Sequence, residues 1–457
     1  MGFEDISIIT SGWNDETTYY KQIEAMITYG NPQGYFGFNE SHSIYGNFAA
    51  WSPVLLMPYV IIGKLFTWNY YTSIIFHLFI WIAAFLLLTI SLRPDYKQLL
   101  SVAAVWLSFE VGLRYIFSVT PESLITVLVF CFFICLIKLN EDIKIPWLIF
   151  ADVCFVLLTL MRGYYAALGL LICHIVWGKA KSKKMLFIQI AIVMASAIGY
   201  ALILHFFTAA YYETLVDTEW MTHPKAFVKV ILLSILEMLV YIKDTIIRTP
   251  SHEAIRGAWY IIYCLLGGWL IYAYKRHKDL IYISSLVCWC AFIGAMWLLY
   301  NAKEGSRQLM ALGIIGIMFS VYFSANKLWT LVVAVILIYS TWFSNDTFFT
   351  TMPQKTEFDA ATVEKIKSEM SEVMELTDST WDNTIIKSAS LDYRFDYTFP
   401  KGFGLNSCYD EYIMEHIDEL KGKYIATTSI EDIDAFIEAQ GFELIYSYGG
   451  NNVYRIR

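Results

Sequence analysis

The residues with the most evident chemistry lie near the start of the chain, in a polar, glycine- and aromatic-rich stretch between residues 11 and 66. The adjacent acids Asp15 and Glu16 stand near its beginning, and His42 lies further along. Long segments with so many ordering side chains are uncommon as simple connections and are often functional. Two neighbouring carboxylates can hold a divalent cation or take a proton from a hydroxyl. A second interpretation is structural: Asn14 or Asp15 could cap a helix that has acidic residues in its first turn.

A second set of chemical candidates consists of arginines at the ends of apolar segments. Charges in or beside a membrane are costly, and they are usually functional or paired. A guanidinium group matches a phosphate with two parallel hydrogen bonds and stabilises charge on a departing phosphate. Arg162 and Arg307 are the first candidates for such a role, followed by Arg114 or Arg256. Two alternatives stay open: each arginine could reach the interface with only its head group, and Arg114 could form an ion pair with Glu110, one turn away.

These side chains must be positioned by membrane-spanning helices. The chain is 57% hydrophobic and 16% charged, whereas soluble domains average about 25% charged residues. Crossing about 30 Å of hydrocarbon requires roughly 20 apolar residues in a helix. Segments that meet or approach this length lie at about 71–92, 98–118, 121–139, 145–162, 164–178, 185–211, 256–274, 279–300, 307–323 and 328–343. The sequence therefore predicts a mainly α, polytopic transmembrane bundle of about ten helices over residues 71–344.

Basic residues in short loops predict the orientation of this bundle. The loops at 93–97, 138–144, 179–184 and 275–278 are rich in Lys and Arg and fall on one side of a ten-span arrangement. Such loops favour the cytoplasm, so residues 1–70 and 345–457 are expected outside. An apolar stretch near 226–247 contains Lys229 and Glu237, and we expect it to lie on the outer interface as an amphipathic helix.

The two polar ends of the chain complete the predicted domains. Residues 1–70 are expected to form an outer loop with juxtamembrane helices, and residues 345–457 a small extracytoplasmic α/β domain. In the latter, the patterns predict helices at 359–377 and 430–440 and strands at 423–428, 442–448 and 452–456. Because no apolar run precedes Trp13, we also expect a further span upstream of Met1.

The order of motifs along the chain resembles a known class of membrane enzymes. An Asp-Glu pair, an aromatic-rich helix, a glycine-rich turn, a W-x-P sequence and a short apolar helix ending in G-K-L-F follow one another within residues 15–66. Pro121-Glu122 and Met161-Arg162-Gly163 follow at helix ends expected on the same side. This order resembles membrane glycosyltransferases of the GT-C class, which include protein O-mannosyltransferases and the aminoarabinose transferases of lipid A. The resemblance spans roughly residues 11–345 and implies a GT-C-like bundle.

The resemblance also implies an activity. The chain would be a multi-pass protein of the cell membrane that moves a sugar from a polyprenyl-phosphate donor, with inversion, to a glycan, lipid or protein acceptor on the outer face. Asp15 would act as the catalytic base, and Glu16 would orient it or share a divalent metal ion with it. Substrate contacts are expected from Arg114, Glu122, Arg162, Arg307 and His42.

The same residues bear on other classes of function. No clustered basic segment suited to nucleic acid is present in the sequence. A transporter or lipid flippase would place its charges near the middle of the membrane, whereas these charges gather at one face. A non-catalytic scaffold that presents the C-terminal domain to a partner would need neither Asp15 nor the arginines.

Overall fold

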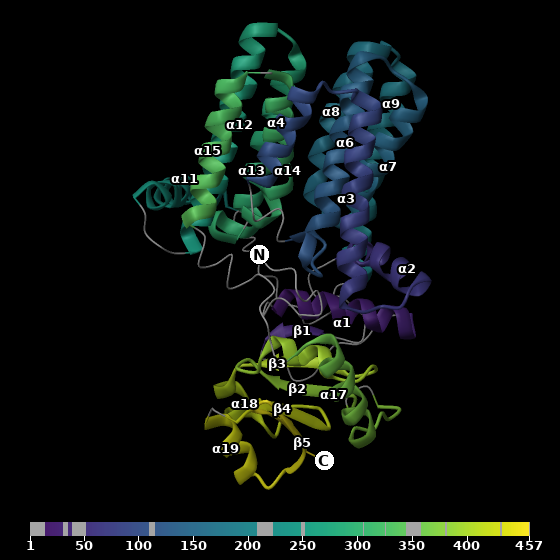
Figure 1. The fold of residues 1–457 in the computed structure, drawn as a ribbon, viewed down its shortest axis with the longest axis vertical. Helices are drawn as coiled ribbons and strands as arrows, with labels where there is room; N and C mark the ends of the chain where they lie inside the picture. The colour runs from purple at the N-terminus through teal and green to yellow at the C-terminus, as the bar shows by residue number, and fades with distance from the viewer. Residues whose placement is uncertain are drawn as a thin grey trace.

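A computed structural model describes residues 14–30, 35–38, 52–108, 115–207, 223–247, 252–304, 306–324, 326–343, 358–379, 382–429 and 432–456. The molecule is elongated, with a helical bundle at one end and a sheet domain at the other (Figure 1). The bundle helices are α3 (Tyr70–Leu92), α4 (Tyr96–Leu107), α6 (Glu122–Glu141), α7 (Ile145–Met161), α8 (Gly169–Ile175), α9 (Lys183–Phe207), α12 (His252–His277), α13 (Leu280–Glu304), α14 (Ser306–Ser324) and α15 (Lys327–Phe343).

Length and composition qualify several of these helices as membrane spans. Among the described residues, five helices are long and apolar enough to cross a bilayer, namely α3, α6, α9, α12 and α13, and α7, α14 and α15 contain shorter apolar helices. Helix α6 is buried along most of its length at the centre of the bundle, whereas α9 turns large apolar side chains such as Phe187 outward. Apolar surface on this scale suits contact with lipid. The chain is therefore a multi-pass membrane protein.

Two of the expected spans have a different form in the structure. In the segment expected at 98–118, helix α4 ends at Leu107, and residues 115–117 form a short 3₁₀ helix. The segment expected at 164–178 is a 3₁₀ helix over Gly163–Leu168, then α8, then a π turn over Val176–Ala180. Glycines allow α9 to approach closely here, because a Cβ at Gly163 would lie 2.4 Å from the ring of Tyr200. The second segment is thus helical from Gly163 to Ala180 but changes its helix type twice. The span expected at 98–118 stays a prediction, because residues 109–114 lie outside the described part.

Two helices lie outside the set of spans, as the sequence predicts. Helix α2 (Met57–Leu65) is short and follows a 3₁₀ turn at Pro53–Leu55. Helix α11 (Pro224–Ile247) does not qualify as a span, and Figure 1 shows it lying across the bundle, near the end that faces the sheet domain. Helix α12 packs tightly on it, since a Cβ at Gly257 would lie 2.1 Å from the carbonyl oxygen of Tyr241.

The sheet domain contains one six-stranded sheet with the order β1-β3-β2-β4-β6-β5. Its strands are β1 (Tyr35–Phe38), β2 (Thr384–Ser388), β3 (Gly404–Cys408), β4 (Tyr424–Thr428), β5 (Glu443–Tyr448) and β6 (Asn451–Arg455). The first four in spatial order are parallel, and β6 and β5 are antiparallel to their neighbours. Helix α17 (Ala360–Val373) covers one face, and α18 (Asp410–His416) and α19 (Asp432–Ala439) cover the other.

The sheet joins the two polar ends of the chain. The strands expected at 423–428, 442–448 and 452–456 and the two expected helices are confirmed. Strands β2 and β3 are additional, and the edge strand β1 comes from the N-terminal segment and pairs with β3. The N-terminal and C-terminal parts that the sequence separates therefore share one sheet.

Candidate functional site

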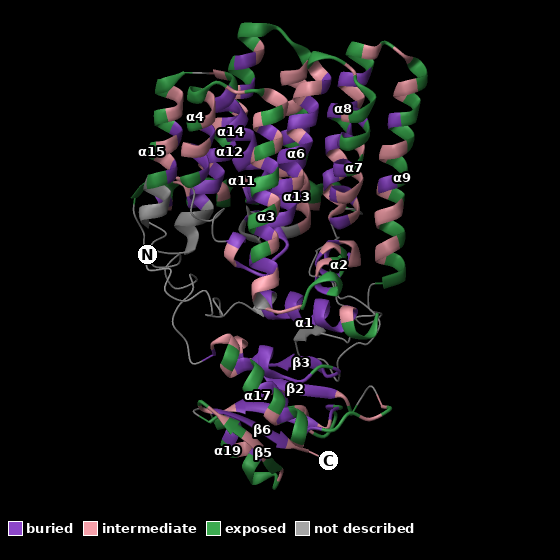
Figure 2. Cartoon of the chain, turned by 45° about the vertical axis from the view of Figure 1, so that its right-hand side comes forward, coloured by how far each residue is buried: buried purple, intermediate pink, exposed green. Residues whose placement is uncertain are grey.

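The central element of the candidate site is α1 (Asn14–Tyr29), which lies between the bundle and the sheet domain. Every side chain from Glu16 to Met26 is buried, and Figure 2 shows the buried colour along most of the helix. Tyr19, Ile23 and Met26 pack into the bundle core. Tyr20 instead packs into the sheet-domain core. The helical spacing of these residues directs two opposite faces of α1 toward two different bodies.

Charged and polar contacts hold α1 to the sheet domain. The hydroxyl of Thr17 donates to a carboxylate oxygen of Asp396 at 3.0 Å, and Lys21 donates to the carbonyl of Phe399 at 2.7 Å. Glu24 accepts from Lys21 at 2.7 Å and from Lys367 at 2.8 Å. Because Lys367 belongs to α17, these contacts cross between distant parts of the chain.

The position of Glu24 between two ammonium groups changes its acidity. Burial alone would raise the pKa of this carboxyl, but the charges and hydrogen bonds of Lys21 and Lys367 outweigh burial and lower the pKa from 4.5 to about 2. Glu24 is therefore ionised at neutral pH, and the contact is an ion-paired bridge.

On the bundle side, an ion pair joins two helix ends. A carboxylate oxygen of Glu122 lies 2.7 Å from the guanidinium of Arg162, and both side chains are nearly buried. Glu122 is the first residue of α6 and Arg162 follows the last residue of α7. The macrodipoles favour an anion at the first position and a cation at the second. Arg162 also donates to the hydroxyl of Tyr164 at 3.3 Å.

A buried histidine adds a second polar contact beside this pair. Nδ1 of His77 lies 3.2 Å from the carbonyl oxygen of Ile116, and Nε2 lies 2.7 Å from the hydroxyl of Tyr59. A carbonyl oxygen can only accept, so Nδ1 carries the proton and Nε2 accepts from Tyr59. In the neutral imidazole, these two contacts select the tautomer with its proton on Nδ1.

Five of these residues form one group, which we call the outer cluster because the sequence predicts that this end lies outside the cell: Tyr19, Tyr59, His77, Glu122 and Arg162. Tyr19 lies close enough to Arg162 and Tyr59 to interact electrostatically with both. Glu122 likewise interacts with His77 and Tyr59. Four elements, α1, α2, α3 and α6, and the residue after α7 thus bring polar side chains to the end of the bundle that faces the sheet domain.

The structure describes the side chains of only some of the predicted site residues. Glu16, Glu122 and Arg162 are described and lie at the same end of the bundle. Asp15 is in the first turn of α1 and Arg307 in the first turn of α14, but their side chains lie outside the described part. Arg256 lies in α12, and its side chain is likewise outside the described part. Arg114 and His42 fall outside the described residues.

Polar side chains deeper in the bundle have structural contacts. Asp152 accepts an interhelical hydrogen bond from Gln189 at 3.0 Å, and His174 bonds to Ser284 at 2.8 Å. Sequence reasoning did not single out Tyr19 or Tyr59. Both are tyrosines in an aromatic-rich stretch, and no spacing signal distinguishes them from their neighbours.

The described residues contain no group of three or more His, Cys, Asp or Glu side chains that could hold a metal ion. Glu16 is buried in α1, and the adjacent Asp15 is described only by its backbone. A metal ion held by Asp15 and Glu16 therefore stays a prediction.

Comparison with known proteins gives a distant likeness. No protein-family model and no curated protein sequence matches the chain. The oligosaccharyltransferase of Archaeoglobus fulgidus, solved with Zn and sulfate, is 12% identical with a TM-score of 0.44, covering 98% of this chain and 70% of its own. ArnT from Cupriavidus metallidurans, bound to undecaprenyl phosphate, is 10% identical with a TM-score of 0.49, covering 98% and 94%.

Proposed function

We propose that the chain transfers a sugar from a polyprenyl-phosphate donor to a hydroxyl of an acceptor on the side of the sheet domain. The observation that carries this proposal is the position of α1. The helix that contains Asp15 and Glu16 is buried against the end of the bundle where Arg162 pairs with Glu122. Segments more than 100 residues apart, which the sequence connects only by motif order, thus meet in one place.

The chemistry follows from these residue types. The acceptor oxygen attacks the anomeric carbon and loses its proton to Asp15, while the bond from that carbon to the phosphate oxygen breaks. The electron pair leaves with the polyprenyl phosphate, whose charge Arg162 and Arg307 stabilise. Glu122 holds Arg162 in place at 2.7 Å. Attack opposite the leaving group inverts the anomeric carbon. Glu16 orients Asp15 or shares a divalent cation with it, and Arg114 and His42 contact the substrate.

The position of the proposed site suits both substrates. A polyprenyl-phosphate donor carries its phosphate at the level of the head groups and its chain in the hydrocarbon, which matches a site at the ends of spanning helices. The basic loops lie at the opposite end of the bundle from the sheet domain, and basic loops favour the cytoplasm. The acceptor therefore approaches from outside the cell, beside the extracytoplasmic sheet domain.

The test is transfer of radiolabelled sugar from a panel of polyprenyl-phosphate donors to membrane extracts. We expect donor-dependent labelling by the wild type and its loss in Asp15→Asn. Asp142→Asn is the matched control, because Asp142 is an exposed acid at the other end of α6. Labelling that survives in Asp15→Asn would keep the class of enzyme and move the base to Glu16 or Glu122. Absence of labelling with every donor, from folded protein, would favour a transporter, a flippase or a scaffold.

A further inference from the structure

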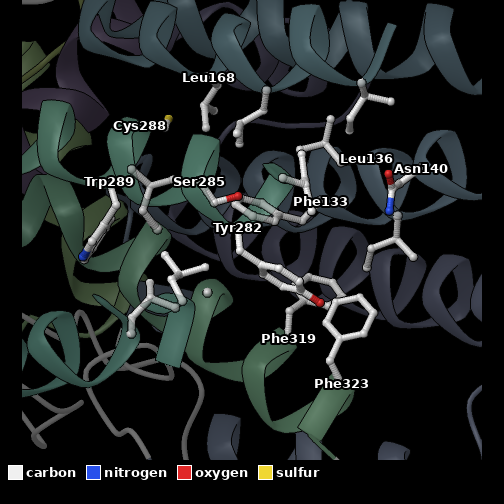
Figure 3. A pocket seen from close by; sticks show the side chains of 18 of the residues that line it. Phe133, Leu136, Asn140, Leu168, Tyr282, Ser285, Cys288, Trp289, Phe319 and Phe323 are labelled. Carbon is white, nitrogen blue, oxygen red and sulfur yellow. The ribbon is translucent and has the colours of Figure 1, made fainter. Parts of the chain in front are cut away.

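An apolar cavity of about 280 Å³ lies inside the bundle, away from the outer cluster. It is lined by side chains of α6, α8, α12, α13 and α14 and by Leu168, and most of its wall is apolar. Figure 3 shows Asn140 and Trp289 at opposite ends of this cavity, with Phe133, Tyr282 and Phe319 between them. Because the surrounding helices span the membrane, apolar matter is the natural content of such a space.

The exposure of its lining residues shows where the cavity opens. Phe323 is 48% exposed and Glu141 is also exposed, and they lie in the last turns of α14 and α6. By contrast, Leu168 and Phe292 at the other end are each 1% exposed. The cavity is therefore closed toward the middle of the bundle and open at the end where the basic loops lie.

A turn with three basic residues lies beside this opening. The turn between α12 and α13 contains Lys275, Arg276 and Lys278, all exposed, with Asp279 as its acid. This turn adjoins the cavity directly, since the ring of His277 lies 5.9 Å from that of the lining residue Tyr282. At the opening, the exposed acid Glu141 is paired with Lys138, and the exposed Asp142 follows it. An apolar cavity with a basic rim matches a molecule with a hydrocarbon chain and an anionic head group.

We propose that this cavity binds an anionic phospholipid from the leaflet that contains the basic loops. One acyl chain enters between α6, α13 and α14, and the phosphate lies against the turn at residues 275–278. The site is separate from the one proposed for sugar transfer, because it opens at the opposite end of the bundle. Its occupation fills a space that would otherwise leave the facing side chains without packing contacts.

The experiment measures lipid retention by native mass spectrometry. Full-length protein is released from nanodiscs of phosphatidylcholine that contain phosphatidylglycerol as the anionic probe. We expect wild-type protein to retain phosphatidylglycerol in preference to phosphatidylcholine by about tenfold, a ratio consistent with several basic groups near a phosphate. Replacing Lys275, Arg276 and Lys278 together with Gln should bring this ratio close to one.

Two variants separate the cavity from general surface charge. Ser285→Trp places a large side chain in the cavity and should reduce retention of both lipids several-fold. Replacing Lys181, Lys183 and Lys184 with Gln removes the same number of charges at the same end of the bundle. These residues lie just before and in the first turn of α9, which does not line the cavity. This control should retain the wild-type preference.

Three results would overturn the proposal. They are equal retention of the two lipids by wild-type protein, retention unchanged in Ser285→Trp, and an equal loss of preference in the two triple charge variants. Since the charge variants alter only exposed side chains, the test does not depend on whether Ser285→Trp folds. Loss of sugar transfer would not bear on it, because retention is measured without a donor.

Discussion

At the scale of single residues, the outer cluster contains two charged groups whose transfer from water into an apolar environment is costly unless they are paired. Glu122 and Arg162 are nearly buried at a separation of 2.7 Å, and each lies where its helix dipole favours its charge. Removing one partner of such a pair leaves an uncompensated charge and costs about 3–5 kcal/mol. A substitution that keeps the charge is therefore the informative one.

The first prediction concerns the shape of the Arg162 side chain. Arg162→Lys keeps the positive charge beside Glu122 but loses the planar fork that binds phosphate at two points. We expect sugar transfer to fall by roughly 10²-fold, the scale of losing one transition-state donor, while the protein remains folded. The measurement is the initial rate at saturating donor. Arg93→Lys, at the other end of the bundle, is the control. Equal rates in wild type and Arg162→Lys would remove Arg162 from phosphate recognition.

The second prediction concerns the ion-paired bridge at Glu24. The pKa of Glu24 is about 2 in the folded protein and 4.5 in its ordinary environment. Between these values the unfolded chain binds the extra proton, so the free energy of unfolding rises with pH there and the contribution is lost as pH falls toward 2. The shift corresponds to stability on the order of 3 kcal/mol.

This pH dependence is measured as the apparent unfolding midpoint of the detergent-solubilised protein between pH 5 and pH 3. Glu24→Gln should be less stable than wild type at pH 5 and should change less between the two values. Glu372→Gln replaces an exposed acid on α17 and serves as the control. A Glu24→Gln variant with the full wild-type pH dependence would show that another group titrates.

At the scale of elements, the sequence predicts what periodicity and apolar length control. Long apolar runs identify α3, α6 and α9, and the alternating patterns identify β4, β5 and β6. Strands β2 and β3 are each five residues, and β3, with the sequence GLNSC, is made of residues with little strand preference. The burial of β3 between β1 and β2, rather than its own sequence, therefore determines its conformation, whereas β2 begins with the strand-forming residues Thr384, Ile385 and Ile386. The change of helix type over residues 163–180 accompanies close contact with α9, since a Cβ at Gly163 or Gly169 would lie 2.4 Å from a side chain of α9.

The third prediction concerns the packing of α11 on α12. A Cβ at Gly257 would lie 1.9 Å from the hydroxyl oxygen of Thr245 and 2.1 Å from a backbone carbonyl, and a backbone cannot yield cheaply. Gly257→Ala should therefore lower stability by about 1–3 kcal/mol, measured as a reduced apparent unfolding midpoint. Gly268, in the same helix, has no atom near its added Cβ. Gly268→Ala should be neutral or stabilising, and a similar loss in both variants would contradict the packing argument.

At the scale of the whole molecule, the arrangement depends on contacts that no local pattern reveals. The basic residues predict that four loops lie at one end of the bundle. In the fold, the sheet domain lies at the opposite end. Burial of α1 between two bodies and pairing of β1 with β3 join residues more than 350 positions apart. Motif order brings Glu16, Glu122 and Arg162 into one hypothesis, but only folding brings them to one end of the bundle. Tyr19 and Tyr59 become recognisable only at this scale.

The last prediction tests which side of the membrane this end faces. Glu372→Cys adds a thiol on an exposed position of α17, and Lys183→Cys adds one on an exposed position at the start of α9. A charged, impermeant maleimide should label Glu372→Cys in intact cells, and Lys183→Cys only after permeabilisation, because basic loops remain in the cytoplasm. The wild type gives the background, since seven of its cysteines lie in bundle helices and Cys408 is buried. The reverse pattern would place the acceptor in the cytoplasm and contradict an envelope role for the proposed transferase.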